Sequence, residues 1–368
     1  MSARGGRRRR IAVVFGGRSA EHEISVISAR SVLGALDPER YDVVTIGIDK
    51  QGRWHHLHAL PGPGRAGELA AVGAEEGQGV ALSREPGETA LVGDDGTRRE
   101  IDVVFPVLHG PYGEDGTIQG MLELAGIPYV GAGVLGSALG MDKAVQKTLF
   151  VAAGLPVVAH EAIHERDWER DRAGVTARAE ALGLPVFVKP ATLGSSVGIS
   201  KVKRIDELPA AMEEALSFAG KAVIERSMEA AREIECGVLG NDDPVASVLG
   251  EIIPSGEFYD YRAKYLDEGT RLEVPAQMPA AIAEEVQRIA VAAFQAIDAS
   301  GMARVDFFVR EPAEIVLNEI NTIPGFTPIS MYPKLWEASG VPYDELIGRL
   351  VDLALERHER DAKRGRTL

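Results

Sequence analysis

Cysteine is nearly absent from this chain, because Cys236 is the single one in 368 residues. An intrachain disulfide is therefore impossible, a structural zinc cluster is disfavoured, and a reducing, cytoplasmic location is the simplest expectation. The sequence also lacks an apolar run of about 18 residues, which predicts that no helix crosses a membrane.

Positive charge is in deficit as well, since 40 Lys and Arg residues face 55 Asp and Glu residues and the formal net charge is -15. Such a chain repels a phosphate backbone, so a dedicated nucleic-acid binder is disfavoured and an anionic ligand would need local lysines. An arginine run occupies 7–10, but the apolar stretch after it, 11–15, is too short for a signal-peptide core. We expect a solvated tail there, with membrane or nucleic-acid contact as the minor alternative.

The length and the apolar pattern predict an α/β protein of two or three domains. Apolar runs at 11–15, 43–48 and 101–108 predict buried strands, and a helix from about 25 to 36 makes the first two into a βαβ unit of a parallel sheet. Between them, 60–99 is rich in Gly, Ala, Glu and Pro, and we expect it to be a peripheral excursion outside the core.

After about residue 140 the pattern changes to helices and antiparallel strands. Short apolar strands are predicted at 185–190, 222–225 and 234–239. An amphipathic helix is predicted at 281–298, with an apolar face that belongs to the core, and a last helix at 343–358. The core face of the first of these helices consists of Ile282, Val286, Ile289, Ala293 and Ile297.

The most informative pattern is a β-hairpin with polar side chains at alternating positions. The two alternating sets are Arg304, Asp306 and Phe308 in one arm, and Leu317, Glu319 and Asn321 in the other. A four-residue loop at 311–314 would place Asp306 opposite Glu319, and Arg304 opposite Asn321.

This register gives the hairpin a candidate metal site. Facing carboxylates such as Asp306 and Glu319 repel each other unless something positive lies between them. Together with Asn321 they supply the hard oxygen ligands that suit Mg²⁺ or Mn²⁺ bridging substrate phosphates. The alternative is an ordinary surface hairpin with solvated acids.

A glycine- and hydroxyl-rich loop at 189–198 is a candidate phosphate cover. Its backbone N–H groups and the hydroxyls of Ser195 and Ser196 can donate to phosphate oxygens, while Lys189 adds a positive charge. The loop is not a P-loop, because it lacks that spacing and leads into a strand. An ordinary hairpin turn is the alternative.

Two further groups follow strands of the predicted parallel sheet. Glu21 comes after the glycine turn that ends the first strand, and His109 directly follows the strand at 101–108, so both can face one crevice. For Glu21 the alternative is a helix cap. The polar and aromatic segment 259–265 is expected to be a lid. Separately, Gly325 can present its N–H to an oxyanion, with Arg304 as the charged partner.

The chain resembles the ATP-grasp superfamily, and within it the D-alanine–D-alanine ligases, from residue 11 to about 351. The resemblance rests on these segments, in this order: FGGRSAEHEIS, LHGPYGEDGTIQG, MDK, VKPATLGSSVGISKV, EFYDYRAKY, ARVDFF and LNEINTIPGF. It implies a Rossmann-like parallel-sheet domain followed by a two-lobed, α+β ATP-grasp fold. The implied divisions are an N-terminal domain with a D-alanine crevice at 1–140, a central lobe with the glycine-rich loop at 141–232, and a C-terminal lobe with the metal hairpin at 233–368.

The resemblance implies a two-step ligation. ATP phosphorylates the carboxylate of one D-alanine, and the amine of a second attacks the acyl phosphate to give the dipeptide, ADP and phosphate, for peptidoglycan precursors. The family also suggests a cytoplasmic homodimer. Alternatives are a D-alanine–D-lactate or D-alanine–D-serine ligase, and an ATP-binding regulatory protein without turnover; Tyr265, in an intact closing-loop sequence, argues against the lactate enzyme.

The resemblance also assigns roles by position. For ATP it implies Lys143 and Lys189 at the phosphates, the loop serines Ser195 and Ser196, Glu225 and Glu233 at adenine and ribose, and Lys264 at the transferred phosphoryl group. For two Mg²⁺ or Mn²⁺ ions it implies Asp306, Glu319 and Asn321. For the substrates it implies Glu21 at the first ammonium, His109 near its carboxylate, Arg304 and Gly325 at the oxyanion, and Ser330 at the second carboxylate. Glu21, Ser195 and Tyr265 match a trio that closes the site, whereas Ile323 and Pro328 depart from the family pattern and receive no role.

Overall fold

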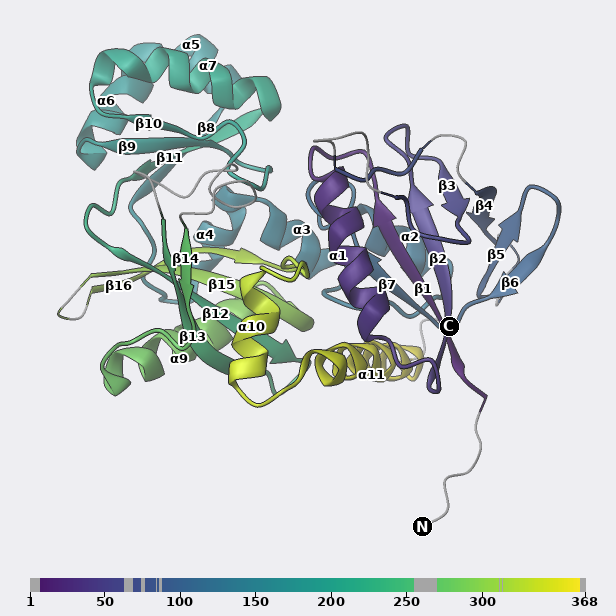
Figure 1. Ribbon diagram of the computed structural model, residues 1–368. Coiled ribbons are helices and arrows are strands. Elements are labelled where there is room, and N and C mark those ends of the chain that lie inside the picture. Colours follow the sequence, from purple (N-terminus) through teal and green to yellow (C-terminus); the bar gives the residue numbers. More distant parts are fainter. Residues whose placement is uncertain are drawn as a thin grey trace.

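The computed structural model describes residues 7–62, 69–73, 77–83, 85, 88–254, 270–310, 312 and 314–364. Its framework is three β-sheets of seven, four and five strands. The first sheet lies at the right of Figure 1, the second at the upper left and the third at the lower left, each with helices against it. None of the helices within the described ranges is long and apolar enough to cross a bilayer. The predicted α/β class is confirmed.

The first sheet is built on the predicted βαβ unit. Strand β1 (Arg9–Gly16) leads through α1 (His22–Ala35) to β2 (Tyr41–Ile48), and β1 lies parallel to both β2 and β7 (Val103–Val107). The run at 11–15 is fully buried, as expected for a central strand covered on both faces.

The prediction that 60–99 lies outside the core is wrong for its described parts, although they do lie at the outer edge of the sheet. Strands β3 (Trp54–His56), β4 (Gln78–Leu82), β5 (Ala90–Gly93) and β6 (Arg98–Glu100) continue the first sheet through antiparallel pairs. Val80 and Leu91 are buried in a core cluster of that sheet. Strands of three to five residues contain too few alternations to stand out in a segment rich in glycine and proline.

The second sheet is small and antiparallel. Its strands are β8 (His160–His164), β9 (Val186–Pro190), β10 (Ser200–Val202) and β11 (Lys221–Arg226), in the order β10-β9-β11-β8. Helices α5 (Glu165–Arg170), α6 (Arg172–Leu182) and α7 (Leu208–Phe218), with the short η1 (Ile205–Glu207), cover its outer face (Figure 1). Trp168, Val175 and Met212 fill the core between these helices and the strands.

The third sheet carries the predicted hairpin at one edge. Its strands are β12 (Arg232–Gly240), β13 (Val245–Ile253), β14 (Arg271–Glu273), β15 (Gly301–Arg310) and β16 (Glu314–Asn321), in the order β14-β13-β12-β15-β16. Helix α9 (Ala280–Ala296) covers one face, and Val286, Ile289, Ala293 and Ile297 are buried there with Ile282 at the margin, as predicted. Helix α10 (Met331–Ala338) contacts β12 and β13.

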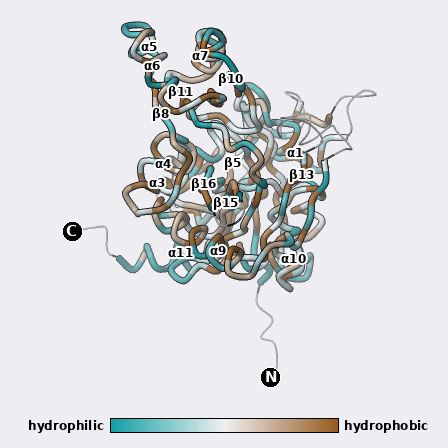
Figure 2. Tube along the Cα trace, turned by 90° about the vertical axis from the view of Figure 1, so that its left-hand side faces the viewer, coloured by the Kyte–Doolittle hydropathy of each residue, from teal (hydrophilic) through white to brown (hydrophobic). Residues whose placement is uncertain are grey.

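The remaining helices connect the sheets. Helices α2 (Thr117–Leu124), α3 (Val134–Met141) and α4 (Lys143–Ala152) lie between the first and second sheets in the chain. Helix α11 (Tyr343–Ala362) packs Leu350 and Val351 into one core cluster with Val13 and Phe105 of the first sheet. Its last turns are hydrophilic (Figure 2). The domain limits at 140 and 232 stay a prediction.

The hairpin has the predicted register but not the predicted loop. Asp306 pairs with Glu319 and Arg304 with Asn321, yet Arg310 pairs with Glu314, so Glu314 belongs to a strand and not to the loop. The pairing shifts between Asp306 and Phe307, because Asn318 is an extra residue in β16, which is a β-bulge. The shorter loop and the bulge compensate for each other.

The bulge also corrects the predicted side-chain alternation. Leu317 does not share a face with Glu319; it is fully buried in the core under α9, together with Phe307 and Ile320. The bulge residue Asn318 and the residues after it, Glu319 and Asn321, line the same cavity as Asp306. A period-two pattern cannot reveal such an inserted residue from the sequence.

Candidate active site

A cavity of about 540 Å³ lies where the three sheets meet. Its wall combines the loop after β1, the segment after β7, the start of α4, the glycine-rich loop, β11, β12 and the β15–β16 hairpin. The predicted residues on this wall are Glu21, His109, Lys143, Lys189, Ser195, Ser196, Glu225, Glu233, Arg304, Asp306, Glu319, Asn321, Gly325 and Ser330. Lys264 and Tyr265 lie outside the described residues.

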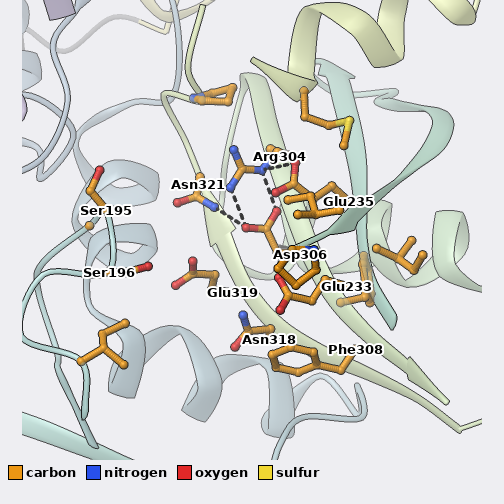
Figure 3. Close-up of a pocket in the computed structure, with 18 of the residues that line it drawn as sticks. Ser195, Ser196, Glu233, Glu235, Arg304, Asp306, Phe308, Asn318, Glu319 and Asn321 are labelled. Atoms are coloured by element: carbon orange, nitrogen blue, oxygen red, sulfur yellow. Dashed lines mark hydrogen bonds and ion pairs between the residues drawn. The ribbon is translucent and has the colours of Figure 1, made fainter. Parts of the chain in front are cut away.

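The polar face of the hairpin is held by a buried guanidinium. Arg304 donates from Nε and Nη2 to the two oxygens of Asp306, both at 2.7 Å, and its Nε lies 3.1 Å from Glu235 Oε2. Figure 3 shows Glu235 and Asp306 on either side of this group. Burial opposes the charge of Arg304, but Asp306 and Glu235 outweigh it and raise the pKa of the guanidinium. Sequence reasoning missed Glu235, although alternation along β12 places it on the same face as Glu233.

The two facing carboxylates are each compensated by the protein itself. Lys143 Nζ lies 3.1 Å from Glu319 Oε2, while Arg304 binds Asp306. The repulsion that suggested a metal between them is therefore reduced by side chains. Among the described residues no group of three His, Cys, Asp or Glu side chains gathers as a metal site.

The donor atoms nevertheless fit Mg²⁺ or Mn²⁺ in kind. Asn321 Nδ2 donates to Asp306 Oδ2 at 3.0 Å, and its amide oxygen points the other way, towards the loop that carries Ser195 (Figure 3). Asp306, Glu319 and Asn321 thus offer only oxygen atoms from one end of the hairpin, which is the donor chemistry that these ions prefer.

Three buried lysines lie beside the hairpin. Lys189 Nζ lies 2.6 Å from Glu225 Oε2, and Lys147 Nζ lies 3.1 Å from Glu225 Oε1. Burial would raise the pKa of Glu225, but the two ammonium groups outweigh it and lower that pKa to about 2. Lys143 lies beside Glu319, so the three lysines alternate with the acids of this wall. Sequence reasoning missed Lys147, although it follows Lys143 by one helical turn on the same face.

Glu21 occupies the N-cap position of α1, but its side chain does not cap the helix. The glycine turn delivers it to the start of α1: Gly16 has φ +90°, and a Cβ there would lie 2.3 Å from Ile48 O, so only glycine fits. The side chain of Glu21 makes no capping hydrogen bond. Its carboxylate instead accepts a hydrogen bond from Ser195 Oγ, on the opposite side of the cavity. The structure therefore joins two of the three residues of the predicted closing trio.

The segment after β7 adds a second acid to this wall. Gly110 N–H donates to Glu114 Oε1 at 2.7 Å, and a Cβ at Gly110 would lie 2.8 Å from Glu21 Oε2, so both carboxylates crowd around one glycine. Burial and the nearby charge of Glu21 raise the pKa of Glu114 to about 8. Burial lowers the pKa of His109, whose Nε2 lies 3.1 Å from Ser28 Oγ. Sequence reasoning quoted Glu114 within a motif but gave it no role.

The turn after the hairpin closes on itself beside Arg304. Thr327 N–H and Thr327 Oγ1 lie 3.0 and 2.8 Å from Ser330 Oγ. A Cβ at Gly325 would come within 2.7 Å of the same oxygen. Gly325 and Ser330 are thus adjacent in the cavity wall, and their predicted oxyanion and carboxylate contacts stay a prediction.

The parallel-sheet domain and the two further sheets around a lysine-rich cavity define the ATP-grasp class of fold. Family models described as D-ala D-ala ligase N-terminus and D-ala D-ala ligase C-terminus match residues 10–132 and 149–352. The chain therefore belongs to the D-alanine–D-alanine ligase family.

Individual relatives agree with this assignment. The D-alanine–D-alanine ligase of Geobacillus thermodenitrificans is 48% identical over 356 residues, which is 95% of this chain and 96% of the relative. That of a Mycobacterium species is 51% identical over 369 residues, covering 95% and 97%. The solved D-alanine–D-alanine ligase from Coxiella burnetii superposes with a TM-score of 0.85 at 37% identity, covering 97% of each chain. The VanG D-Ala:D-Ser ligase from Enterococcus faecalis gives 0.81 at 34%, covering 95% of this chain and 100% of that one.

Proposed function

We propose that this protein joins two D-alanine molecules into D-alanyl-D-alanine with the hydrolysis of ATP, as a step in making peptidoglycan precursors. The observation that carries the proposal is one cavity with two unlike walls. Lysines and an oxygen-rich hairpin suit a nucleoside triphosphate, and the carboxylate of Glu21 on the opposite wall suits an ammonium group. Family membership supports the same assignment.

The nucleotide wall supplies charge and orientation. Lys143 and Lys189 bind the phosphates, the loop with Ser195 and Ser196 covers them, Glu225 and Glu233 border adenine and ribose, and Lys264 meets the transferred phosphoryl group. Asp306, Glu319 and Asn321 would hold two Mg²⁺ or Mn²⁺ ions, which when bound neutralise charge on the phosphates. The γ-phosphoryl group then passes to the carboxylate of the first D-alanine, and ADP is the leaving group.

The substrate wall orients the two amino acids. Glu21 binds the ammonium of the first D-alanine, with His109 near its carboxylate, and Ser330 binds the carboxylate of the second. The neutral amine of the second attacks the acyl carbon and forms the C–N bond, and Arg304 and Gly325 N–H stabilise the resulting oxyanion. Collapse of this intermediate breaks the C–O bond to phosphate, and the nitrogen releases its proton as phosphate leaves. Closure of the Glu21, Ser195 and Tyr265 trio excludes water from the acyl phosphate. The working form we propose is a cytoplasmic homodimer.

Product analysis tests this proposal. The purified protein is incubated with ATP, Mg²⁺ and an equimolar mixture of D-alanine, D-serine and D-lactate near neutral pH, and products are separated by mass spectrometry. D-alanyl-D-alanine with one ADP per bond is the expected result. A predominant ester would mean that the second substrate is D-lactate, and predominant D-alanyl-D-serine that it is D-serine. ATP binding without any product would mean that the protein binds ATP but is not a ligase.

A further inference from the structure

We infer that Lys147 is a positioning residue, which fixes the β-bulge at Asn318 and thereby aims Glu319 into the cavity. The inference rests on the proposed function for the role of Glu319 but on the structure for the contacts. Lys147 is fully buried, and neither the predicted phosphate contacts nor the predicted metal ligands include it.

Lys147 contacts the outer edge of β16. β16 is an edge strand of the third sheet, and within the described ranges its outward side pairs only through an isolated bridge of Leu317 to Val157. Three contacts close this edge. Leu317 N–H donates to Pro156 O at 2.8 Å, Lys147 Nζ donates to Asn318 O at 2.6 Å, and Ile320 N–H donates to Gln146 Oε1 at 2.9 Å.

Asn318 forms the bulge in β16. A bulged residue lacks a ladder partner, so its carbonyl is the group whose direction the sheet itself does not set. Lys147 donates to that carbonyl, and Gln146 holds the amide two residues further on. Glu319 lies between these two anchored groups. Its carboxylate is met by Lys143 from the preceding turn of the same helix.

Lys147 also contacts the second sheet. Its Nζ lies 3.1 Å from Glu225 on β11, so one ammonium joins the edge of the third sheet to the neighbouring sheet. Glu225 also has Lys189 at 2.6 Å, so we expect its carboxylate to stay paired in a variant without Lys147. Loss of Lys147 therefore releases the bulge without leaving a buried acid unpaired.

The test measures nucleotide binding, which does not require turnover. Isothermal titration calorimetry with ADP, with and without Mg²⁺, gives the factor by which Mg²⁺ tightens ADP binding. In Lys147→Met, which keeps the apolar stem, we expect this factor to fall about tenfold or more, as for other residues that orient metal ligands. ADP affinity without Mg²⁺ should change much less. Gln146→Leu should lower the factor in the same direction.

Thr148→Val is the matched control, because Thr148 is exposed on the same helix and donates only to Ala144 O among its described contacts. An unchanged Mg²⁺ factor in folded Lys147→Met, or in Gln146→Leu where the methionine variant does not fold, overturns the inference. So does a wild-type protein in which Mg²⁺ does not tighten ADP. Wild type that couples Mg²⁺ to ADP but forms no dipeptide refutes the proposed function and leaves the inference standing.

Discussion

The two walls of the cavity treat negative charge in opposite ways. On the hairpin wall the acids lie beside cations. Arg304 pairs with both Asp306 and Glu235, and Lys143 pairs with Glu319. The neighbouring Glu225, on β11, lies between two lysines. On the first-sheet wall two carboxylates, Glu21 and Glu114, crowd around Gly110. The hairpin wall is therefore set in its charged form by the protein, whereas the first-sheet wall favours a proton or an incoming ammonium group.

The largest expected effect comes from Asp306→Ala on the hairpin wall. The change removes a proposed metal ligand and the main partner of Arg304, and we expect turnover to fall by about a thousandfold, as for the loss of a preorganised charge in a catalytic site. ADP release with D-alanine and Mg²⁺ measures it. Glu314→Gln, at the exposed far end of the same hairpin, is the control and should retain wild-type activity. Retained turnover in Asp306→Ala would mean that the hairpin has another role.

Glu225→Gln tests the charge compensation within the same wall. It leaves two buried ammonium groups without their carboxylate, and we expect a loss of about 3 to 5 kcal/mol in the free energy of unfolding. The pKa of Glu225 is lowered from 4.5 to about 2 in the folded protein. Its contribution is therefore present above pH 4.5 and lost as pH falls towards 2. Urea unfolding at pH 7 and at lower pH measures the loss in unfolding free energy and its dependence on pH. The exposed Glu345→Gln is the control. Equal stability of Glu225→Gln and wild type at pH 7 would contradict charge compensation on this wall.

Glu114→Gln should give the opposite dependence on pH. The pKa of Glu114 is raised from 4.5 to about 8, so its contribution to stability is full below pH 4.5 and is lost as pH rises through 8. The glutamine variant should therefore gain melting temperature relative to wild type between pH 5 and pH 8. Thermal unfolding at both values checks this, and a constant difference would show that Glu114 is ionised throughout.

Ser195→Ala has the smallest expected effect, because it removes the one hydrogen bond described here between the loop and Glu21. A rise of a few fold in the KM for D-alanine is expected, with little change in ADP affinity, because the net contribution of a hydrogen bond that water can replace is about 0.5 to 1.5 kcal/mol. Ser200→Ala is the control. Ser200 lies just beyond the loop, and the change removes its hydrogen bond to the exposed Glu214. Weaker ADP binding in Ser195→Ala would place the serine on the nucleotide instead.

The sequence predicted the parts of the site that depend on local pattern. Asp306 and Glu319 could be paired from alternation, although the pairing came out right because a shorter loop and the Asn318 bulge cancel. Lys147, Glu114 and Glu235 could not be assigned in the same way. Their roles depend on partners that lie far away in the chain or on burial in the cavity, and neither leaves a periodic signal. The strands within 60–99 were missed because they are short.

The shared core of α11 has a consequence for the order in which the protein can be made. Val13 and Phe105 leave a ribosome well before Leu350 and Val351, which help to bury them. Arg357 in the same helix donates to Tyr129 O at 3.0 Å and to Ser300 Oγ at 2.8 Å. The first sheet therefore stays unfinished on one face during synthesis, and its apolar side is covered only when translation has reached the final helix.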